Sequence, residues 1–408
     1  MAGLGIDSAN LAFINYLHVI GQTLNQKALL RNLISEERWA GASREWRVHS
    51  ARSPAIGFTV DGGAFPVADK QDYQTAKVAR RFLAAQIQLS DGAISAIKGE
   101  NAAISAVESE IQGAMTGALK YFNGVNYRDG SGVMAVVQTG TSGTTLLADD
   151  ARMLWDKASF DVYDTTLATN RGQIKVLRTA SAPTAAGYAT VTLEASVPGG
   201  TTAGDKLVWA NGAQNSLNLA VSGLDKLVDD AASSFQNINV ANFPRYSSFV
   251  LDNGGTLRDL TPFLFRAMLA GIKQKSGNER PSDGLKVLGN SWSLINVEEL
   301  YEGEFRISPS DKVAGMAVSS FQSALGKIDV IVDTDALYNK MFFVDFSQIK
   351  RGVVQPLSWR RQGGEIFLRS DNAGVNTATM LEISENYIMN RYTSGKIEDL
   401  NEDKSTMY

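Results

Sequence analysis

One apolar stripe through residues 91–124 constrains the fold more than any other feature of the sequence. Large apolar side chains recur there at spacings of 3, 7, 3, 4, 4, 4 and 3 residues, which places them on one face of an α-helix. The stripe consists of Ile94, Ile97, Ile104, Val107, Ile111, Met115, Leu119 and Phe122. Ser90 or Asp91 can cap the start of this helix, and Gly124 can close its end. We therefore expect a helix of about 32 residues, roughly 48 Å long, whereas the mean globular helix has only about 11 to 12 residues.

A long hairpin is predicted directly before this helix. Partial alternation of apolar side chains in residues 45–60 and 73–90 indicates two strands. The segment that joins them, VDGGAFPVADK at 60–70, is longer than the two to five residues of an ordinary hairpin turn. Pro54 and Pro66 argue against a central position in a sheet, because proline cannot donate a hydrogen bond to the ladder. The segment is therefore either a solvated hairpin protected by its charges or a projection that a partner covers.

The composition argues against a catalytic protein. The chain has 408 residues and no cysteine, so disulfides, thiol catalysis and thiolate zinc sites are excluded together. His18 and His49 are the only histidines, so a Ser-His-Asp triad would have to use one of them and a multi-histidine metal site is implausible. The formal net charge of -4 gives no general affinity for nucleic acids. We expect no catalytic residue, no cofactor and no metal ion. No apolar run of about 18 residues predicts a transmembrane helix, and the N-terminus lacks the basic leader of a signal peptide.

Two further patterns could carry chemistry, and both have a plainer interpretation. Residues 128–145 are glycine-rich but contain neither a complete GxGxxG motif nor the Lys-Ser or Lys-Thr of a P-loop, so we expect a turn-rich connector. Asp333 with Asp335, and Asp229 with Asp230, could form the acid pair or metal site of a carboxylate-dependent hydrolase. No further ligands are spaced around either pair, so turns at strand ends are the favoured explanation.

The remainder of the chain alternates between helices and strands. Residues 11–39 are predicted to form two short helices or one interrupted helical arm, residues 146–155 a short helix, and residues 257–275 and 291–302 two further helices. The helix at 257–275 can start at Thr256 with a capping box, or at Thr261 with Pro262 as its first residue. Strands are predicted over residues 173–179, 188–194, 205–211, 285–289, 327–333, 340–346, 353–359, 365–370 and 378–387. Residues 222–230 are expected to form a turn or short helix, and the polar tail to fray past Leu400.

In this order the elements resemble the major capsid protein of tailed bacteriophages, the Hong Kong 97-type capsid fold, which encapsulin nanocompartments also use. The order is an N-terminal arm, a projecting two-stranded loop, a very long helix, a β insertion, a mixed α/β region and C-terminal strands. Several stretches look like that family in local detail: GGAFPVAD with YQTAKVARRFLAAQIQLSDGAI, YFNGVNYRDGSGVMAVV, GDKLVWANG with SGLDKLVDD, RDLTPFLFRAMLAGIKQKSG with LKVLGNSWSLINVEELYEG, and IDVIVDTDALYNKMFFVDF. The resemblance covers nearly the whole chain.

The resemblance implies an α+β fold, the Hong Kong 97-like capsid fold, with an N-terminal arm, an extended loop hairpin, a long spine helix, peripheral and axial domains and a small β insertion. The implied divisions are the arm (1–44), the extended loop (45–90), a peripheral domain with the spine helix (91–157, helix 91–124), the β-rich insertion (158–228), the axial domain (229–355), and return strands of the peripheral domain with the C-terminal tail (356–408).

The resemblance also implies a structural protein, not an enzyme, that self-assembles as hexamers and pentamers into an icosahedral shell. Such a shell encloses double-stranded DNA without sequence-specific binding, in a virion assembled in the bacterial host cytoplasm. The implied partners are other copies of the chain, with scaffold, portal and decoration proteins as further candidates, and no membrane. Inter-subunit contacts are expected from Arg47, Arg52, Val60, Gly62, Gly63, Phe65, Pro66, Lys70, Arg80 and Arg81. The alternatives are an encapsulin-type shell protein, a carboxylate-dependent hydrolase and a secreted β-rich adhesin.

Overall fold

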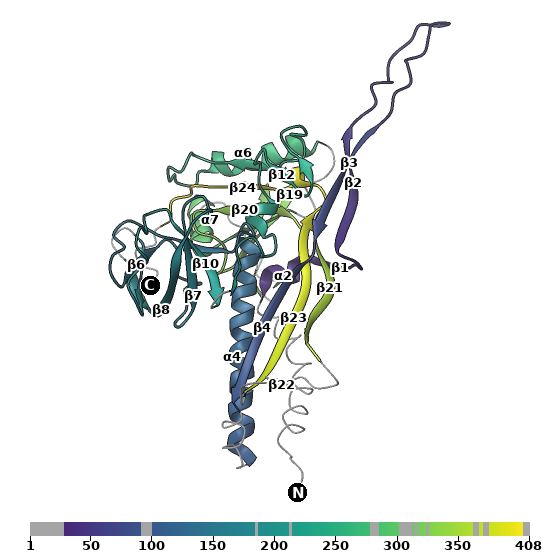
Figure 1. The fold of residues 1–408 in the computed structure, drawn as a ribbon. Helices are drawn as coiled ribbons and strands as arrows, with labels where there is room; N and C mark the ends of the chain where they lie inside the picture. The colour runs from purple at the N-terminus through teal and green to yellow at the C-terminus, as the bar shows by residue number, and fades with distance from the viewer. Residues whose placement is uncertain are drawn as a thin grey trace.

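The computed structural model describes residues 28–90, 100–183, 187–211, 214–277, 285–301, 312–313, 316–317, 319–323, 326–361, 367–369 and 375–402. It has the predicted mixed α+β composition, with many strands and few helices. Figure 1 shows packed sheets at the centre, a long helix that extends from one end, and a loop that projects from the other. Most of the predicted N-terminal arm, together with Ile94 and Ile97, lies outside the described residues.

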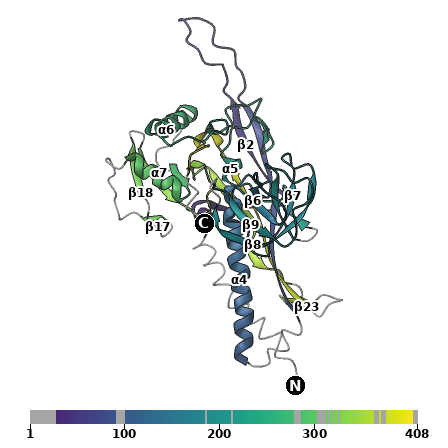
Figure 2. The same cartoon turned by 90° about the vertical axis from the view of Figure 1, so that its left-hand side faces the viewer.

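The long helix α4 (Glu100–Tyr127) confirms the main prediction over the part that is described. It runs alongside strands β4 (Arg81–Ser90) and β23 (Val375–Ile388), as both views show (Figures 1 and 2). The predicted stripe contributes Ile104, Val107, Ile111, Met115, Leu119 and Phe122 to α4, and the last three are buried. The helix therefore supports the sheet with its apolar face.

The end of α4 differs from the prediction. Gly124 lies inside the helix, which continues to Tyr127. A Cβ atom at Gly124 would lie 2.7 Å from Met153 Sδ, so this glycine permits close packing and does not cap the helix. The chain turns afterwards at Gly130, whose φ of +79° lies in the region that favours glycine.

A five-stranded sheet beside α4 joins distant parts of the chain. Its order is β1 (Ser35–Arg38), β21 (Ile349–Trp359), β23 and β22 (Phe367–Arg369), and β4 also pairs with β23. Between residues 28 and 39, α2 (Leu29–Leu33) confirms one short helix of the predicted pattern, but residues 35–38 of that pattern form the strand β1 instead. Parallel pairing with β21 holds β1 extended, and Trp39 packs on Gly352, where a Cβ would lie 3.0 Å from the indole ring.

A second sheet has seven strands, among them the strands that were predicted for the β insertion. Its strands are β5 (Val133–Val136), β6 (Thr145–Ala148), β7 (Ser159–Tyr163), β8 (Asn170–Pro183), β9 (Ala189–Leu193), β10 (Lys206–Asn211) and β11 (Gln214–Asn215). The strands predicted at 173–179, 188–194 and 205–211 are confirmed. Because β5 and β6 pair within this sheet, it begins earlier than the predicted insertion boundary at residue 158.

The short helix predicted over residues 146–155 is wrong, because β6 and turns occupy them. Asp149 Oδ1 accepts a hydrogen bond from the Val136 N–H at 2.7 Å, and Asp150 Oδ1 accepts one from the Arg152 N–H at 2.9 Å. Such side-chain contacts to the backbone compete with helical hydrogen bonds, which explains the difference.

The third sheet has six strands and carries two helices. Its order is β14 (Phe249–Leu251), β24 (Gly395–Ile397), β20 (Met341–Asp345), β15 (Leu285–Gly289), β19 (Gly326–Val332) and β18 (Ser319–Ser323). The helices are α6 (Pro262–Ser276) and α7 (Ser291–Tyr301). Thr261 Oγ1 accepts a hydrogen bond from the Leu264 N–H at 3.1 Å, which confirms the second of the two predicted helix starts.

The C-terminal segment differs from the prediction in two ways. β24 lies between β14 and β20, so it belongs to the third sheet and not with the return strands assigned to residues 356–408. Ile397 and Leu400 are fully buried, which supplies the apolar reason for this placement. Asn401 and Glu402 are also still held by the fold, where Glu402 accepts a hydrogen bond from Asn290 Nδ2 at 2.9 Å, and the rest of the tail that was predicted to fray lies outside the described residues.

The remaining described elements are the two strands of the hairpin and several short segments. They are the hairpin strands β2 (Ser43–Ala51) and β3 (Asp72–Ala79), α5 (Leu224–Leu227), β12 (Ser234–Phe235), β13 (Ile238–Asn239), β16 (Lys312–Val313), β17 (Met316–Ala317) and a 3-10 turn (Arg391–Thr393).

Candidate functional site

The predicted hairpin projects from the molecule, but its paired part is shorter than expected. β2 and β3 pair from Ser43 with Ala79 to Ala51 with Asp72. Residues 52–71, which we call the tip, then continue as an unpaired loop far beyond the sheets (Figure 1). The first strand was predicted to reach Val60, but Pro54 removes a backbone donor soon after Ala51 and so limits the pairing.

The tip exposes its large apolar side chains. Five of them are each at least 80% exposed: Ile56, Phe58, Val60, Phe65 and Val67. Elsewhere in the described chain, most residues of this size are buried in the three sheets and around α4. Exposed apolar side chains gathered on one segment are typical of a surface that another molecule covers.

The two glycines of the tip have separate functions. Gly62 has a φ of +75°, a conformation that other residues rarely adopt. Gly63 donates a backbone hydrogen bond to the Val60 carbonyl at 2.9 Å, and a Cβ on Gly63 would lie 2.9 Å from Val60 Cγ2. The Gly-Gly pair therefore closes a tight turn at the far end of the loop.

Aromatic packing holds the base of the hairpin to the body. The rings of Trp46 on β2 and Tyr387 on β23 have centroids 5.0 Å apart, and Trp39 stacks on the same tyrosine at 6.1 Å. The Tyr387 hydroxyl donates to Glu37 Oε2. The hairpin is thus anchored where it leaves the sheet, whereas the tip projects beyond this anchor (Figure 1).

The four arginines predicted on the hairpin have different surroundings. Arg47 and Arg52 form no ion pair within the ranges that the structure describes. Arg80 lies over the ring of Phe82, 5.3 Å from its centroid. Arg81 already pairs within the chain, with its Nε 3.3 Å from Glu385 Oε2. Arg47 and Arg52 are therefore the two that remain available to a partner.

The acid pair Asp333 and Asp335 forms a turn that binds the end of α4. Asn123 Nδ2 donates to Asp333 Oδ2 at 3.0 Å and to Asp335 Oδ2 at 2.9 Å. The Tyr127 hydroxyl donates to Asp333 Oδ2 at 2.8 Å. Burial, followed by the charge of Asp333, raises the pKa of Tyr127 well above its usual value, so this hydroxyl remains a donor. Burial and repulsion by Asp333 also raise the pKa of Asp335.

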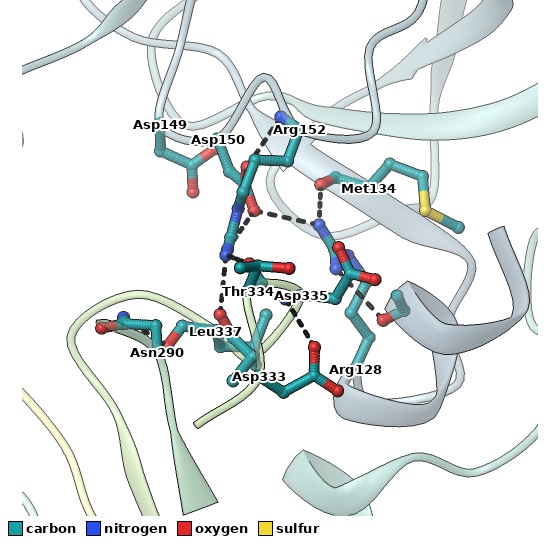
Figure 3. Close-up of polar contacts among 12 residues, drawn as sticks. Arg128, Met134, Asp149, Asp150, Arg152, Asn290, Asp333, Thr334, Asp335 and Leu337 are labelled. Atoms are coloured by element: carbon teal, nitrogen blue, oxygen red, sulfur yellow. Dashed lines mark hydrogen bonds and ion pairs between the residues drawn. The ribbon is translucent and has the colours of Figure 1, made fainter. Parts of the chain in front are cut away.

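Arg152 connects the second sheet to the same turn (Figure 3). Its Nη1 donates to the Ala336 carbonyl at 2.8 Å, and its guanidinium lies 3.8 Å from the ring centroid of Tyr338. Its Nη2 pairs with Asp150 Oδ2 at 2.8 Å, and Arg128 reaches the same oxygen at 3.2 Å. Burial opposes ionisation of Asp150, but the two guanidinium groups hold its pKa well below the usual value. In the sequence, the spacing of Asp150 and Arg152 could have indicated an ion pair between them. It could not have indicated that Arg152 also contacts Ala336 and Tyr338.

The second acid pair, Asp229 and Asp230, is also part of a structural network. Lys396 Nζ lies 3.2 Å from Asp229 Oδ1, and Arg391 Nη2 lies 3.8 Å from Asp229 Oδ2. Burial and the charge of Asp229 raise the pKa of Asp230. Both predicted acid pairs therefore have structural partners in this fold.

The described residues offer few features of other functional classes. Among them, no group of three or more histidine, cysteine, aspartate or glutamate side chains is arranged to bind a metal ion. None of the described helices is long and apolar enough to cross a membrane. A cavity of about 330 Å³ lies between the second sheet and the loop at residues 337–340, and salt-bridged side chains such as Arg128 and Lys340 line it.

The architecture matches solved capsid structures. The capsid asymmetric unit of Cyanophage A-1(L) aligns with a TM-score of 0.54 and 14% identity, over 92% of this chain and 93% of that chain. The capsid of an empty GTA particle has a TM-score of 0.47 at 10% identity, over 92% and 90%. The holo-SrpI encapsulin of Synechococcus elongatus PCC 7942 has a TM-score of 0.43 at 8% identity, over 93% and 89%. No protein-family model and no curated protein matches the sequence.

The chain therefore has the fold of a capsid shell protein. The fold that it shares with the Cyanophage A-1(L) capsid confirms the predicted resemblance to phage capsid proteins, across nearly the full length of both chains.

Proposed function

We propose that this chain is the major capsid protein of a tailed bacteriophage, of the Hong Kong 97 type. Copies of it assemble as hexamers and pentamers into an icosahedral shell that encloses double-stranded DNA. The observation that carries this proposal is the tip at residues 52–71, whose five large apolar side chains are left exposed by the described part of the chain. The capsid fold of the chain supports a second copy of the same chain as the molecule that covers them.

A contact between the tip of one copy and the body of the next is heterologous, and such contacts close into rings. Burial of apolar area stabilises the contact by roughly 25 cal/mol per Å², so five large side chains supply much of the driving force. Arg47 and Arg52, which have no ion-pair partner in the described part of the chain, are the candidates for salt bridges to a neighbour. Val60, Gly62, Gly63, Phe65, Pro66 and Lys70 belong to the same contact surface.

One sequence must fit both hexamers and pentamers, so part of each subunit has to adapt while the rest stays fixed. The aromatic anchor of Trp39, Trp46 and Tyr387 fixes the base of the hairpin. The unpaired tip and its Gly-Gly turn supply the adaptable part. We assign residues 1–44 to the arm, 45–90 to the extended loop, 91–157 to the peripheral domain, 158–228 to the insertion, 229–355 to the axial domain, and 356–408 to the return strands and tail. Two elements cross these boundaries: β5 and β6 join the sheet of the insertion, and β24 joins the third sheet.

The mildly acidic net charge of -4 fits a shell that contains DNA without reading its sequence. Scaffold, portal and decoration proteins are the further partners of such a shell, which is assembled in the bacterial cytoplasm and retained in the virion. The β insertion favours a virus over an encapsulin. Portal and terminase genes beside the gene for this chain would support the virus, whereas a co-expressed enzyme with a targeting tail would support the encapsulin.

Light scattering and negative-stain microscopy of the purified protein test the proposal. Uniform shells, or discrete rings of five and six subunits, are the expected result. A protein that stays monomeric at high concentration would contradict assembly, and the two acid pairs would then be tested in a hydrolase screen.

A further inference from the structure

One buried carboxylate sits where the projecting hairpin joins the body. Glu385 lies on β23 and is 3% exposed. β3 ends at Ala79, and the chain enters the five-stranded sheet at Arg81, which pairs in register with Ser384. Arg81 is thus the first residue after the hairpin that pairs with the five-stranded sheet, and its side chain forms an ion pair with Glu385.

The two oxygens of Glu385 have different partners. Oε1 accepts hydrogen bonds from the Ser222 N–H at 2.7 Å and from the Asn386 N–H at 3.1 Å. Oε2 faces Arg81, whose Nε lies 3.3 Å away. Because Oε1 already accepts two N–H groups, a proton bound by Glu385 belongs on Oε2. The O–H group would then face the N–H of Arg81, and two donors cannot bond to each other.

Few charges face this carboxylate. β4 contributes Arg81, and α5 contributes Lys226. β21 places Gly352 opposite Glu385, and α4 contributes Asn126, which bonds to Asn386; neither is charged. Burial raises the pKa of Glu385 to about 7, against the lowering effects of the Ser222 hydrogen bond and of Arg81. The carboxylate therefore changes its charge in the neutral range.

We propose that Arg81 and Glu385 form a proton-released latch that fixes the direction in which the hairpin leaves the sheet. With Glu385 ionised, the ion pair holds the start of β4 against β23 and the segment before α5. When Oε2 takes up a proton, Arg81 is released to solvent, to which its side chain is already 35% exposed. The hairpin then moves more freely about its aromatic anchor. The inference rests on the proposed function only for its consequence, namely a tip that can be re-aimed during assembly.

The test uses fluorescence energy transfer between dyes on two introduced cysteines. Labelling is specific to these two positions because the chain has no cysteine of its own. Exposed Ala51 at the end of β2 and exposed Ala270 on α6 are the labelling positions. Measurements on dilute, unassembled protomers at pH 6 and pH 8 make the result independent of whether shells form.

We expect a single narrow distance distribution at pH 8 that broadens or shifts at pH 6, with a midpoint near pH 7. Glu385→Gln, which places an amide N–H opposite Arg81, should give the pH 6 distribution at both pH values. Glu45→Gln removes an exposed ion pair with Lys77 on the same hairpin and should behave as the wild type. The experiment is repeated in a His49→Gln background, so that an effect of the His49 side chain on the distance distribution is separated from the effect of Glu385.

Identical wild-type distributions at pH 6 and pH 8 would overturn the proposal, as would a pH response that survives in Glu385→Gln. Arg81→Gln provides a second route if Glu385→Gln does not fold. Arg81→Gln should show the broad distance distribution at both pH 6 and pH 8. A narrow distance distribution in this variant would also contradict the latch.

Discussion

Arg31 on α2 and Glu382 on β23 are 351 positions apart in the chain and form a buried ion pair, with Arg31 Nη1 3.1 Å from Glu382 Oε2. Arg351 on β21 pairs with the other oxygen of the same carboxylate. Both guanidinium groups lie over the ring of Phe122 on α4, at 5.4 and 4.5 Å from its centroid. One carboxylate thus joins α2, which lies within the predicted N-terminal arm, to the sheet and to the long helix.

Replacing Glu382 by alanine should strongly destabilise the protomer. The change removes the ion-pair partner of buried Arg351 and leaves buried Arg31 with only Glu36, 3.6 Å from its Nη2, and breaking a buried pair typically costs about 3–5 kcal/mol. Glu194→Ala is the matched control, because Glu194 pairs with Lys175 at 2.9 Å but both side chains are exposed. The control should cost less than about 1 kcal/mol. Urea unfolding measures the free energy of unfolding of both variants. Similar small decreases for the two would refute a structural role for the cluster of Arg31, Arg351 and Glu382.

Gly223 should not tolerate a side chain. A Cβ at this position would lie 2.6 Å from the carbonyl oxygens of Asn126 and Val125 at the end of α4, and backbone atoms cannot step aside. We expect Gly223→Ala to lower the free energy of unfolding by about 1–3 kcal/mol, the usual cost of overpacking. Gly113→Ala, where an added Cβ meets nothing within 4 Å, should raise it by roughly 0.5–1 kcal/mol. A neutral Gly223→Ala would contradict the packing described.

Tyr127→Phe tests the structural explanation of the acid pair. The variant removes the hydroxyl that donates to Asp333 Oδ2 and leaves a buried carboxylate with one donor fewer. Hydrogen bonds to charged groups contribute about 1.5–3 kcal/mol, so we expect a loss of that size in thermal or urea unfolding. Tyr121→Phe removes a hydroxyl that contacts Ser216 Oγ at 3.3 Å and should cost less. An equal loss in both variants would mean that the Asp333 turn does not depend on Tyr127.

Glu385 should give the protein a pH-dependent stability of defined sign. Its pKa is about 7 in the folded chain against 4.5 for an ordinary glutamate, so the folded state holds the proton more tightly. Its contribution to the free energy of unfolding is therefore greatest below about pH 4.5, declines as the pH rises to about 7, and is constant above. The decline is on the order of 3 kcal/mol. The contribution of Glu385 is the difference between the free energies of unfolding of the wild type and of Glu385→Gln, measured as a function of pH. A difference that rises with pH would contradict the raised pKa of Glu385.

The sequence correctly predicted those helices and strands that are determined by residues close together in the chain. The Thr261-Pro262 start of α6, the strand β15 and the amphipathic stripe of α4 all depend on residues within one or two turns of each other. The order of such elements was enough to indicate the capsid fold.

The missed elements depend on partners far away in the chain. β24 contains Lys396, which looks solvent-exposed in the sequence but is buried because Asp225 lies 2.9 Å from its ammonium group. β1 is polar throughout and is a strand only because β21 pairs with it. The exposure of the tip is a further property that spacing could suggest but not establish, since it requires that no other part of the chain covers it.

Sedimentation of the purified protein beside a tip variant tests the central claim most directly. The variant combines Phe58→Ser and Phe65→Ser, both at exposed side chains, and Leu177→Ser, at an exposed side chain on β8, serves as the control. We predict that the wild type and the control sediment as shells or as rings of five and six, while the tip variant sediments as a protomer with unchanged unfolding temperature. A tip variant that assembles as the wild type does would contradict the claim that the tip holds the subunits together.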